Sequence, residues 1–188
     1  MDDHRSAALN ARNAEGIGLQ VRFFWRGDRH GHTISVLAGD RATDVLESVE
    51  GTSADVWPPS PPLQQLSVEE IRPQTRVALL VGMAGKSHWS MSVEPAGDRT
   101  GFVFDVACRS RDPAGQLGSC YLLKADGRST NGEHDATIEV EGRSIQLRCD
   151  HEGPAPACVK GDPSWLRIEP AVINSVGTTR WRCVIELQ

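Results

Sequence analysis

The sequence predicts a mainly β fold: an antiparallel β-sandwich or flattened β-barrel of about ten strands with little helix. Three observations favour this fold class. Apolar residues recur at every second position in many short segments, which is the period of half-buried strands. Turn residues separate these segments at intervals of about eight to twelve residues, as in sandwiches and barrels. No segment offers the crossover helix that parallel strands require.

The chain of 188 residues is long enough to fold around one hydrophobic core. Roughly 70% of the unfolded surface can be buried at this length, so neither a disulfide nor a metal is needed for folding. We expect a single β domain over residues 17–188. Residues 1–16 are mostly polar, charged or alanine, which predicts a flexible N-terminal tail.

The clearest alternation lies in segment 19–36, where apolar residues occupy odd positions before a polar tip and even positions after it. The pattern predicts a hairpin with one apolar face. With a four-residue loop at the tip, Phe23 lies opposite Ile34. The same register sets Trp25 opposite His32, and a slip of one residue would turn the apolar face to water.

Less regular sequence follows this hairpin. A strand is predicted near residues 43–49. Segment 57–66 contains four prolines, which exclude a helix or a central strand and predict an extended strap. Ser67 and Glu70 have the spacing of a capping box, but Pro73 limits any helix there to about one turn.

A second hairpin is predicted after the strand at residues 75–83. In its register Met91 lies opposite Phe104, and Trp89 lies opposite Val106. Such cross-strand pairs of aromatic and apolar side chains stabilise a hairpin by roughly 0.2–1 kcal/mol each.

The remaining sequence predicts the rest of the sheet. The second hairpin turns at residues 96–99. Ile138 is expected opposite Ile145, across a turn at residues 141–142. The last strands are predicted at residues 118–123, 136–140, 143–149, 165–169 and 178–187.

Charge and composition exclude several partners. The net charge of −5 and the pI near 5.7 argue against nucleic acid, which requires clustered Lys and Arg. No apolar run approaches the roughly 20 residues that cross a bilayer, so no membrane association is expected. The polar start of the chain lacks a secretory signal, and we therefore expect a cytoplasmic protein.

The cysteines agree with that location. They are odd in number and contain no Cys-x-x-Cys pair, which indicates reduced thiols and no zinc site. An alternative pairs Cys149 with Cys158 in an exported protein. The five cysteines are Cys108, Cys120, Cys149, Cys158 and Cys183.

The triplet His30-Gly31-His32 resembles the His-x-His of cupin metal sites. The resemblance ends there, because the glycine and the glutamate that flank the cupin triplet are replaced by Phe24 and by Val36 and Leu37. The predicted register leaves His30 in the loop and sets His32 on the apolar face. We therefore expect two histidines with ordinary hydrogen bonds here, and no metal.

A second candidate combines His88, Ser90 and Asp105, the residue types of a nucleophile, a base and an orienting acid. On the predicted hairpin Ser90 lies opposite Asp105, with His88 on the diagonal. Side chains on one strand face stand parallel, however, and do not converge on one hydroxyl. The pattern favours a hydrogen-bonded polar face over a hydrolytic triad.

Three stretches resemble a bacterial family of uncharacterised proteins. They are His88-Trp89-Ser90-Met91-Ser92-Val93-Glu94, Phe104-Asp105-Val106-Ala107-Cys108-Arg109 and Leu117-Gly118-Ser119-Cys120-Tyr121. The resemblance covers about residues 20–123 and implies no activity, cofactor or site residue.

We hypothesise a non-enzymatic module that binds a small ligand or a protein partner and needs no cofactor. One alternative is a cupin-like metal enzyme or a hydrolase that uses His30, His32 and His88. Another is a structural subunit of a homo-oligomer, assembled through an exposed edge strand or the proline strap. Charged groups on or near the polar faces of the two hairpins form the candidate ligand site: Arg22, Arg26, His30, His88 and Asp105.

Overall fold

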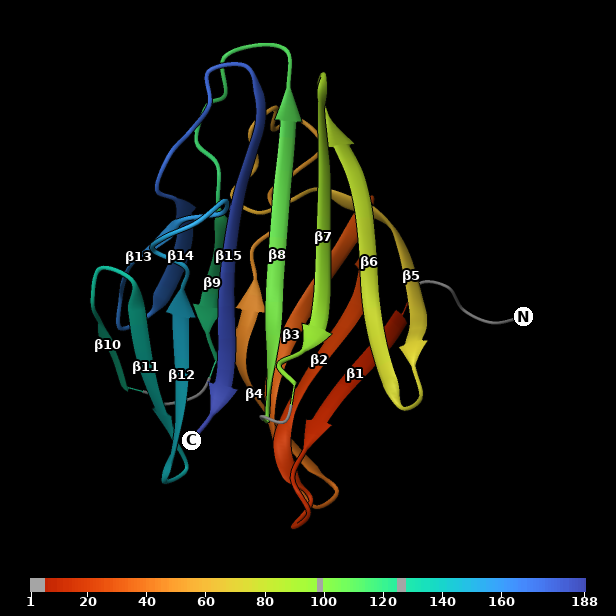
Figure 1. Ribbon diagram of the computed structural model, residues 1–188, viewed down its shortest axis with the longest axis vertical. Helices are drawn as coiled ribbons and strands as arrows, with labels where there is room; N and C mark the ends of the chain where they lie inside the picture. The colour runs from red at the N-terminus through yellow and green to blue at the C-terminus, as the bar shows by residue number, and fades with distance from the viewer. Residues whose placement is uncertain (1–5, 98–99, 125–127) are drawn as a thin grey trace.

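The computed structural model describes residues 6–97, 100–124 and 128–188. In this part of the chain fifteen strands form one antiparallel sheet, and there is no helix. Accordingly, none of the described residues forms a helix that could cross a membrane. The prediction of a mainly β fold is confirmed, although the strands outnumber the ten or so expected. The sheet folds back on itself in two layers and nearly closes into a barrel (Figure 1).

The front layer in Figure 1 has β8 and β15 at its centre. From one side to the other it consists of β10 (Arg128–Asn131), β11 (Asp135–Val140), β12 (Arg143–Cys149), β15 (Gly177–Leu187), β8 (Gly101–Ser110), β7 (Ser87–Pro95), β6 (Thr75–Ala84) and β5 (Leu63–Arg72).

The back layer continues the same sheet through a single pairing of His30 with Leu63. It consists of β1 (Ser6–Arg12), β2 (Ile17–Arg26), β3 (Arg29–Ala38), β4 (Arg41–Ser48), β9 (Ser119–Leu123), β14 (Trp165–Pro170) and β13 (Ala157–Asp162).

The core lies between the two layers, where the predicted alternation turns apolar side chains inward. Phe23 and Phe104 are buried there, on β2 and β8. Trp89 and Trp181 meet edge to face, with ring centroids 6.1 Å apart. Aromatic pairs of this geometry add about 0.5–1.5 kcal/mol beyond the area that they bury.

The predicted register of the first hairpin is wrong by two residues. Phe23 pairs with His32, and Trp25 pairs with His30. The loop contains only two residues, because Gly27 adopts a positive φ of 71° and allows a tight turn. A shift by an even number of residues leaves each side chain on its predicted face.

The second hairpin shows the same error. Met91 pairs with Val106, and Val93 pairs with Phe104. The turn predicted at residues 96–99 includes residues 98–99, which lie outside the described residues. The predicted pairing of Ile138 with Ile145 is confirmed.

The expected flexible tail is wrong over Ser6–Arg12, where β1 pairs with β2 along its whole length. Leu9 and Ala11 are buried on its inner face. Alanine is a poor strand former, so the alternation was weak in the sequence, and packing against the core overrides that propensity.

The proline strap is also shorter than predicted, because β5 begins at Leu63. The turn of helix expected after Ser67 is absent: this serine hydroxyl bonds to Glu69 within the strand. Leu66 and Val68 pack against the core, which favours the strand over a local helix cap.

Candidate ligand site on the front layer

The five residues predicted to line a site lie in three separate places. Arg22 and Arg26 lie on the back layer and are half exposed, His30 is buried, and His88 and Asp105 lie on the front layer. The structure therefore does not bring the polar groups of the two hairpins together.

The two predicted arginines of the back layer, Arg22 and Arg26, are both engaged in ion pairs. Arg22 pairs with Asp44 at 3.4 Å. Arg26 pairs with Glu47 and lies 3.3 Å from Glu50. Glu50 is buried, and its burial raises the pKa of the carboxyl group above the usual value, although the Ser48 hydroxyl and Arg26 oppose this shift. Carboxylates of the back layer therefore already hold both arginines.

His30 lies in β3 and not in a loop, and only 3% of its surface is exposed. Its ring meets Trp25 edge to face at 4.9 Å, and its Nδ1 has no hydrogen-bond partner among the described residues. Burial lowers the pKa of His30.

His32 lies two residues further along β3, inside the core. Its Nε2 is 3.1 Å from the hydroxyl of Tyr121, and its ring stacks on Phe104. Burial lowers the pKa of His32 to about 4, so it is a neutral core residue at pH 7. Within the described residues, no group of three or more His, Cys, Asp and Glu side chains could hold a metal ion.

The His88, Ser90 and Asp105 side chains, which the sequence suggested as a candidate triad, are not assembled into one. His88 pairs with Arg109 across β7 and β8, whereas Asp105 lies four residues away along β8. At about 3.3 Å per residue, this separation is roughly 13 Å. Asp105 instead accepts a hydrogen bond from Arg180 at 2.7 Å. The two groups cannot act on one hydroxyl.

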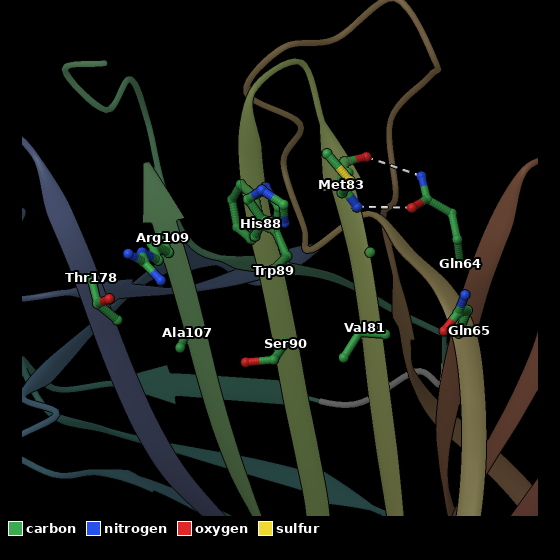
Figure 2. Close-up of a pocket in the computed structure, with 11 residues that line it drawn as sticks. Gln64, Gln65, Val81, Met83, His88, Trp89, Ser90, Ala107, Arg109 and Thr178 are labelled. Atoms are coloured by element: carbon green, nitrogen blue, oxygen red, sulfur yellow. Dashed lines mark hydrogen bonds between the residues drawn. The ribbon is translucent and has the colours of Figure 1, made fainter. Parts of the chain in front are cut away.

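His88 does line a hollow of about 540 Å³ on the outer face of the front layer (Figure 2). Cross-strand pairing arranges the outer side chains of β6, β7 and β8 in rows. One row contains Val81, Ser90 and Ala107. Because the last two side chains are small, the surface is hollow above them.

The next row gives the hollow one apolar and one polar wall. Met83 pairs with His88, and His88 pairs with Arg109. Val81 and Met83 are 47% and 48% exposed, a large fraction for apolar side chains. Trp89 lies beneath the hollow, and its indole N–H donates to the hydroxyl of Ser87.

The rim at β5 depends on a register shift between Leu63 and Gln65. At this bulge the side-chain amide of Gln64 replaces a main-chain partner. Its oxygen accepts from the Met83 N–H at 2.8 Å, and its amide group donates to the Met83 carbonyl at 3.0 Å (Figure 2). The bulge holds Gln64 and Gln65 at the edge of the hollow.

Arg109 is the chemically distinctive group of the hollow. Beyond the backbone pairing of their strands, the side chains of Arg109 and His88 make no hydrogen bond or ion pair in the part of the chain that the structure describes. Lys86 and Arg111 adjoin them in a smaller hollow. Of these, Lys86 pairs with Asp112 at 3.3 Å. An acidic protein thus displays a local cluster of cations with little compensation.

The sequence prediction missed Arg109, Val81 and Met83. A signal for Val81 was present, because residues 77–81 form a continuous apolar run on an antiparallel strand. Such a run makes both faces of the strand apolar, so the outer face must be exposed or covered by a partner.

The described cysteines are free thiols. The Cys149–Cys158 disulfide of the exported alternative is not formed, because both thiols are free. In the register of β12 and β15, Cys149 lies opposite Cys183. Burial raises the pKa of Cys149 to about 12, which makes it a poor nucleophile.

No protein-family model and no curated protein matches the chain, in agreement with the resemblance to uncharacterised proteins. Two solved structures of the heparan sulfate lyase HepC from Pedobacter heparinus are similar, each with a TM-score of 0.58. A mutant of that lyase has 11% identity and covers 98% of this chain; the other structure has 10% identity and covers 95%. The chain spans about a third of the lyase, 36% of its length. At these identities the likeness shows the fold alone.

Proposed function

We propose that this chain is a non-enzymatic module that binds an acidic organic ligand in the hollow of the front layer. One observation carries the proposal: the hollow combines a polar wall with an exposed apolar wall. Arg109 and His88 form the polar wall, and their side chains have no hydrogen-bond or ion-pair partner among the described residues. Val81 and Met83 form the apolar wall.

The two walls suit the two parts of such a ligand. A guanidinium group binds a carboxylate or a sulfate through two parallel hydrogen bonds, and no internal carboxylate among the described residues competes for Arg109. Val81 and Met83 can cover an apolar body or the apolar face of a sugar ring. The volume of about 540 Å³ is within the range of small-molecule sites.

The similar fold of a heparan sulfate lyase suggests the first probe. Heparan sulfate is an acidic polysaccharide, and a short fragment of it carries the carboxylates and sulfates that Arg109 would bind. We therefore expect acidic oligosaccharides to bind this module better than neutral ones, without being cleaved.

Calorimetric titration with a heparan sulfate tetrasaccharide tests the proposal. We expect the wild type to bind it, and Arg109→Ala to weaken binding at least tenfold, about 1.4 kcal/mol. Arg22→Ala is the matched control, because it removes one cation from the other layer. Equal losses in both variants would indicate diffuse charge attraction, and no binding to the wild type would contradict the acidic-saccharide ligand.

A second titration tests whether the hollow is the binding site even if the ligand is not an acidic saccharide. An alkyl carboxylate such as octanoate offers the same anion on an apolar body. Binding of octanoate that depends on Arg109 would retain the hollow as the site and change the ligand class. Failure of both probes, with the chain folded, would overturn the proposed function.

We also propose a cytoplasmic location, supported by the odd number of cysteines. Fractionation of cells that express the full-length protein, followed by labelling of free thiols, tests it. Recovery outside the cytoplasm or with oxidised cysteines would contradict it.

A further inference from the structure

β1 is an edge strand with an open hydrogen-bonding side. Among the described residues it pairs with β2 alone. Asn13 N–H donates to the Ile17 carbonyl at 2.8 Å. Bonded pairs alternate along an antiparallel ladder, so residues 7, 9 and 11 bond to β2. The main-chain groups of the even-numbered residues point away from β2, and no backbone hydrogen bond found in the described ranges uses them.

The other exposed edges carry features that oppose pairing. β5 has two register shifts, the charges of Glu69 and Glu70, and Pro73 directly after it. β10 and β13 lie against each other where the sheet nearly closes. β1 has no bulge and no proline, and its only charge is Arg12 at one end. Natural sheets protect edges that must stay unpaired, and β1 lacks this protection.

The sequence of β1 also suits pairing with a copy of itself. In an antiparallel arrangement centred on Leu9, Ala8 of one copy lies opposite Asn10 of the other. Ser6 then lies opposite Arg12, so no like charges face each other. The outer side chains of Ala8 and Asn10 are small enough for close approach, and the Leu9 residues of the two copies lie opposite each other at the two-fold axis.

We propose that two copies of this chain associate through β1, edge to edge and antiparallel, so that the back layers form one continuous sheet. This contact is separate from the hollow of the front layer. Seven residues per strand make a small interface, which predicts a weak dimer with a dissociation constant on the order of micromolar or above.

Sedimentation of the full-length chain over about 5 to 500 μM tests the proposal directly. We expect the mass to rise from one copy of 20.5 kDa towards two. A wild type that stays monomeric at every concentration would overturn it.

Ala8→Pro removes one outward N–H that the fold itself does not use, and proline is tolerated on an edge strand. We expect this variant to dimerise at least tenfold more weakly with an unchanged melting temperature. Ala8→Ser, which keeps the N–H, is the control and should behave as the wild type. A folded Ala8→Pro that dimerises normally would refute the pairing.

Hydrogen exchange on the wild type keeps the test valid if the proline variant does not fold. Amides of Ala8 and Asn10 should gain protection as concentration rises, whereas those of Leu9 and Ala11 should be protected throughout. A dimer in which the first pair stays unprotected would assign the contact to another surface and overturn the proposal.

Discussion

The two hairpins that stand out in the sequence, β2–β3 and β7–β8, both carry arginine and histidine, but these residues have different roles in the two hairpins. Arg26 of the first is held by Glu47 and Glu50, and its histidines are buried in the core. Arg109 and His88 of the second line a hollow, and their side chains have no hydrogen-bond or ion-pair partner among the described residues. A cation on a strand becomes available for a ligand only when no neighbouring strand supplies a carboxylate.

The difference lies in the neighbours rather than in the hairpins. β4 and the segment after it bring Asp44, Glu47 and Glu50 beside β2 and β3. Next to Arg109, β15 offers Thr178, and the one carboxylate of β8 is taken by Arg180. The first hairpin should therefore govern stability and the second should govern binding.

The largest expected effect concerns His32 of the first hairpin. Its pKa falls from 6.5 in the unfolded chain to about 4 in the fold. Folding therefore favours the neutral ring, and this stabilisation is complete above pH 6.5 and is lost as the pH falls towards 4. The wild type should lose about 3 kcal/mol of unfolding free energy over this range through this group.

Urea unfolding at pH 7 and pH 4.5 measures this loss. His32→Phe should be less stable at pH 7 by about 2 kcal/mol, because the buried Tyr121 hydroxyl loses its partner, but should lose less on acidification. His88→Phe, on the second hairpin, should retain the acid dependence of the wild type. Equal acid dependence in all three proteins would break the comparison.

The next largest effect concerns the hollow itself. Ala107→Phe places a ring over the small side chains of the second hairpin, so ligand affinity should fall at least tenfold, about 1.4 kcal/mol. Unfolding free energy should change by less than about 0.5 kcal/mol, because the position is on the outer face. Ser92→Phe, on the same face but outside the lining of the hollow, should bind normally. Unchanged binding by Ala107→Phe would place the ligand elsewhere.

Arginine removal sharpens the comparison further. Arg26→Ala should lower the unfolding free energy by about 1 kcal/mol, because the buried Glu50 carboxylate loses a partner. Arg109→Ala should stay within about 0.5 kcal/mol of the wild type. Thermal and urea unfolding at pH 7 would show this, and the reverse order would contradict the assignment of roles.

The smallest effect is expected for Arg22→Ala. Its pair with Asp44 is exposed, with 53% and 39% of the two side chains accessible, so the pair contributes little. We expect a change below about 0.5 kcal/mol in urea unfolding. A loss as large as that of Arg26→Ala would indicate that the whole network on this face acts as one unit.

The sequence predicted the faces of the strands better than their partners. The inward positions of Phe23, Met91 and Phe104 follow from alternation alone and are confirmed. Both hairpin registers were wrong by two residues, because alternation is insensitive to an even shift and the loop lengths were overestimated. β1 and β5 were missed because alanine in one and prolines before the other hide strands that only the core stabilises.

The site could be predicted only in part. The outward position of His88 could be predicted, because the alternation of a regular strand shows which polar residues face outward, and His88 does line the hollow. Which arginine is free cannot be read in this way, since Asp105 and Arg180 are far apart in sequence and meet only in the sheet. Availability for a ligand is set by pairings between distant strands.

β15 is the last of the described strands along the chain, yet it lies inside the front layer between β8 and β12. During folding, β8 and β12 each have one edge without hydrogen-bond partners until β15 pairs with them. Forming these pairs joins segments that are far apart in sequence. Sheets with such non-local pairing fold over roughly milliseconds to seconds. During that interval the unpaired edges of β8 and β12 can form hydrogen bonds with other chains and cause aggregation, so the refolding yield should fall as the protein concentration rises.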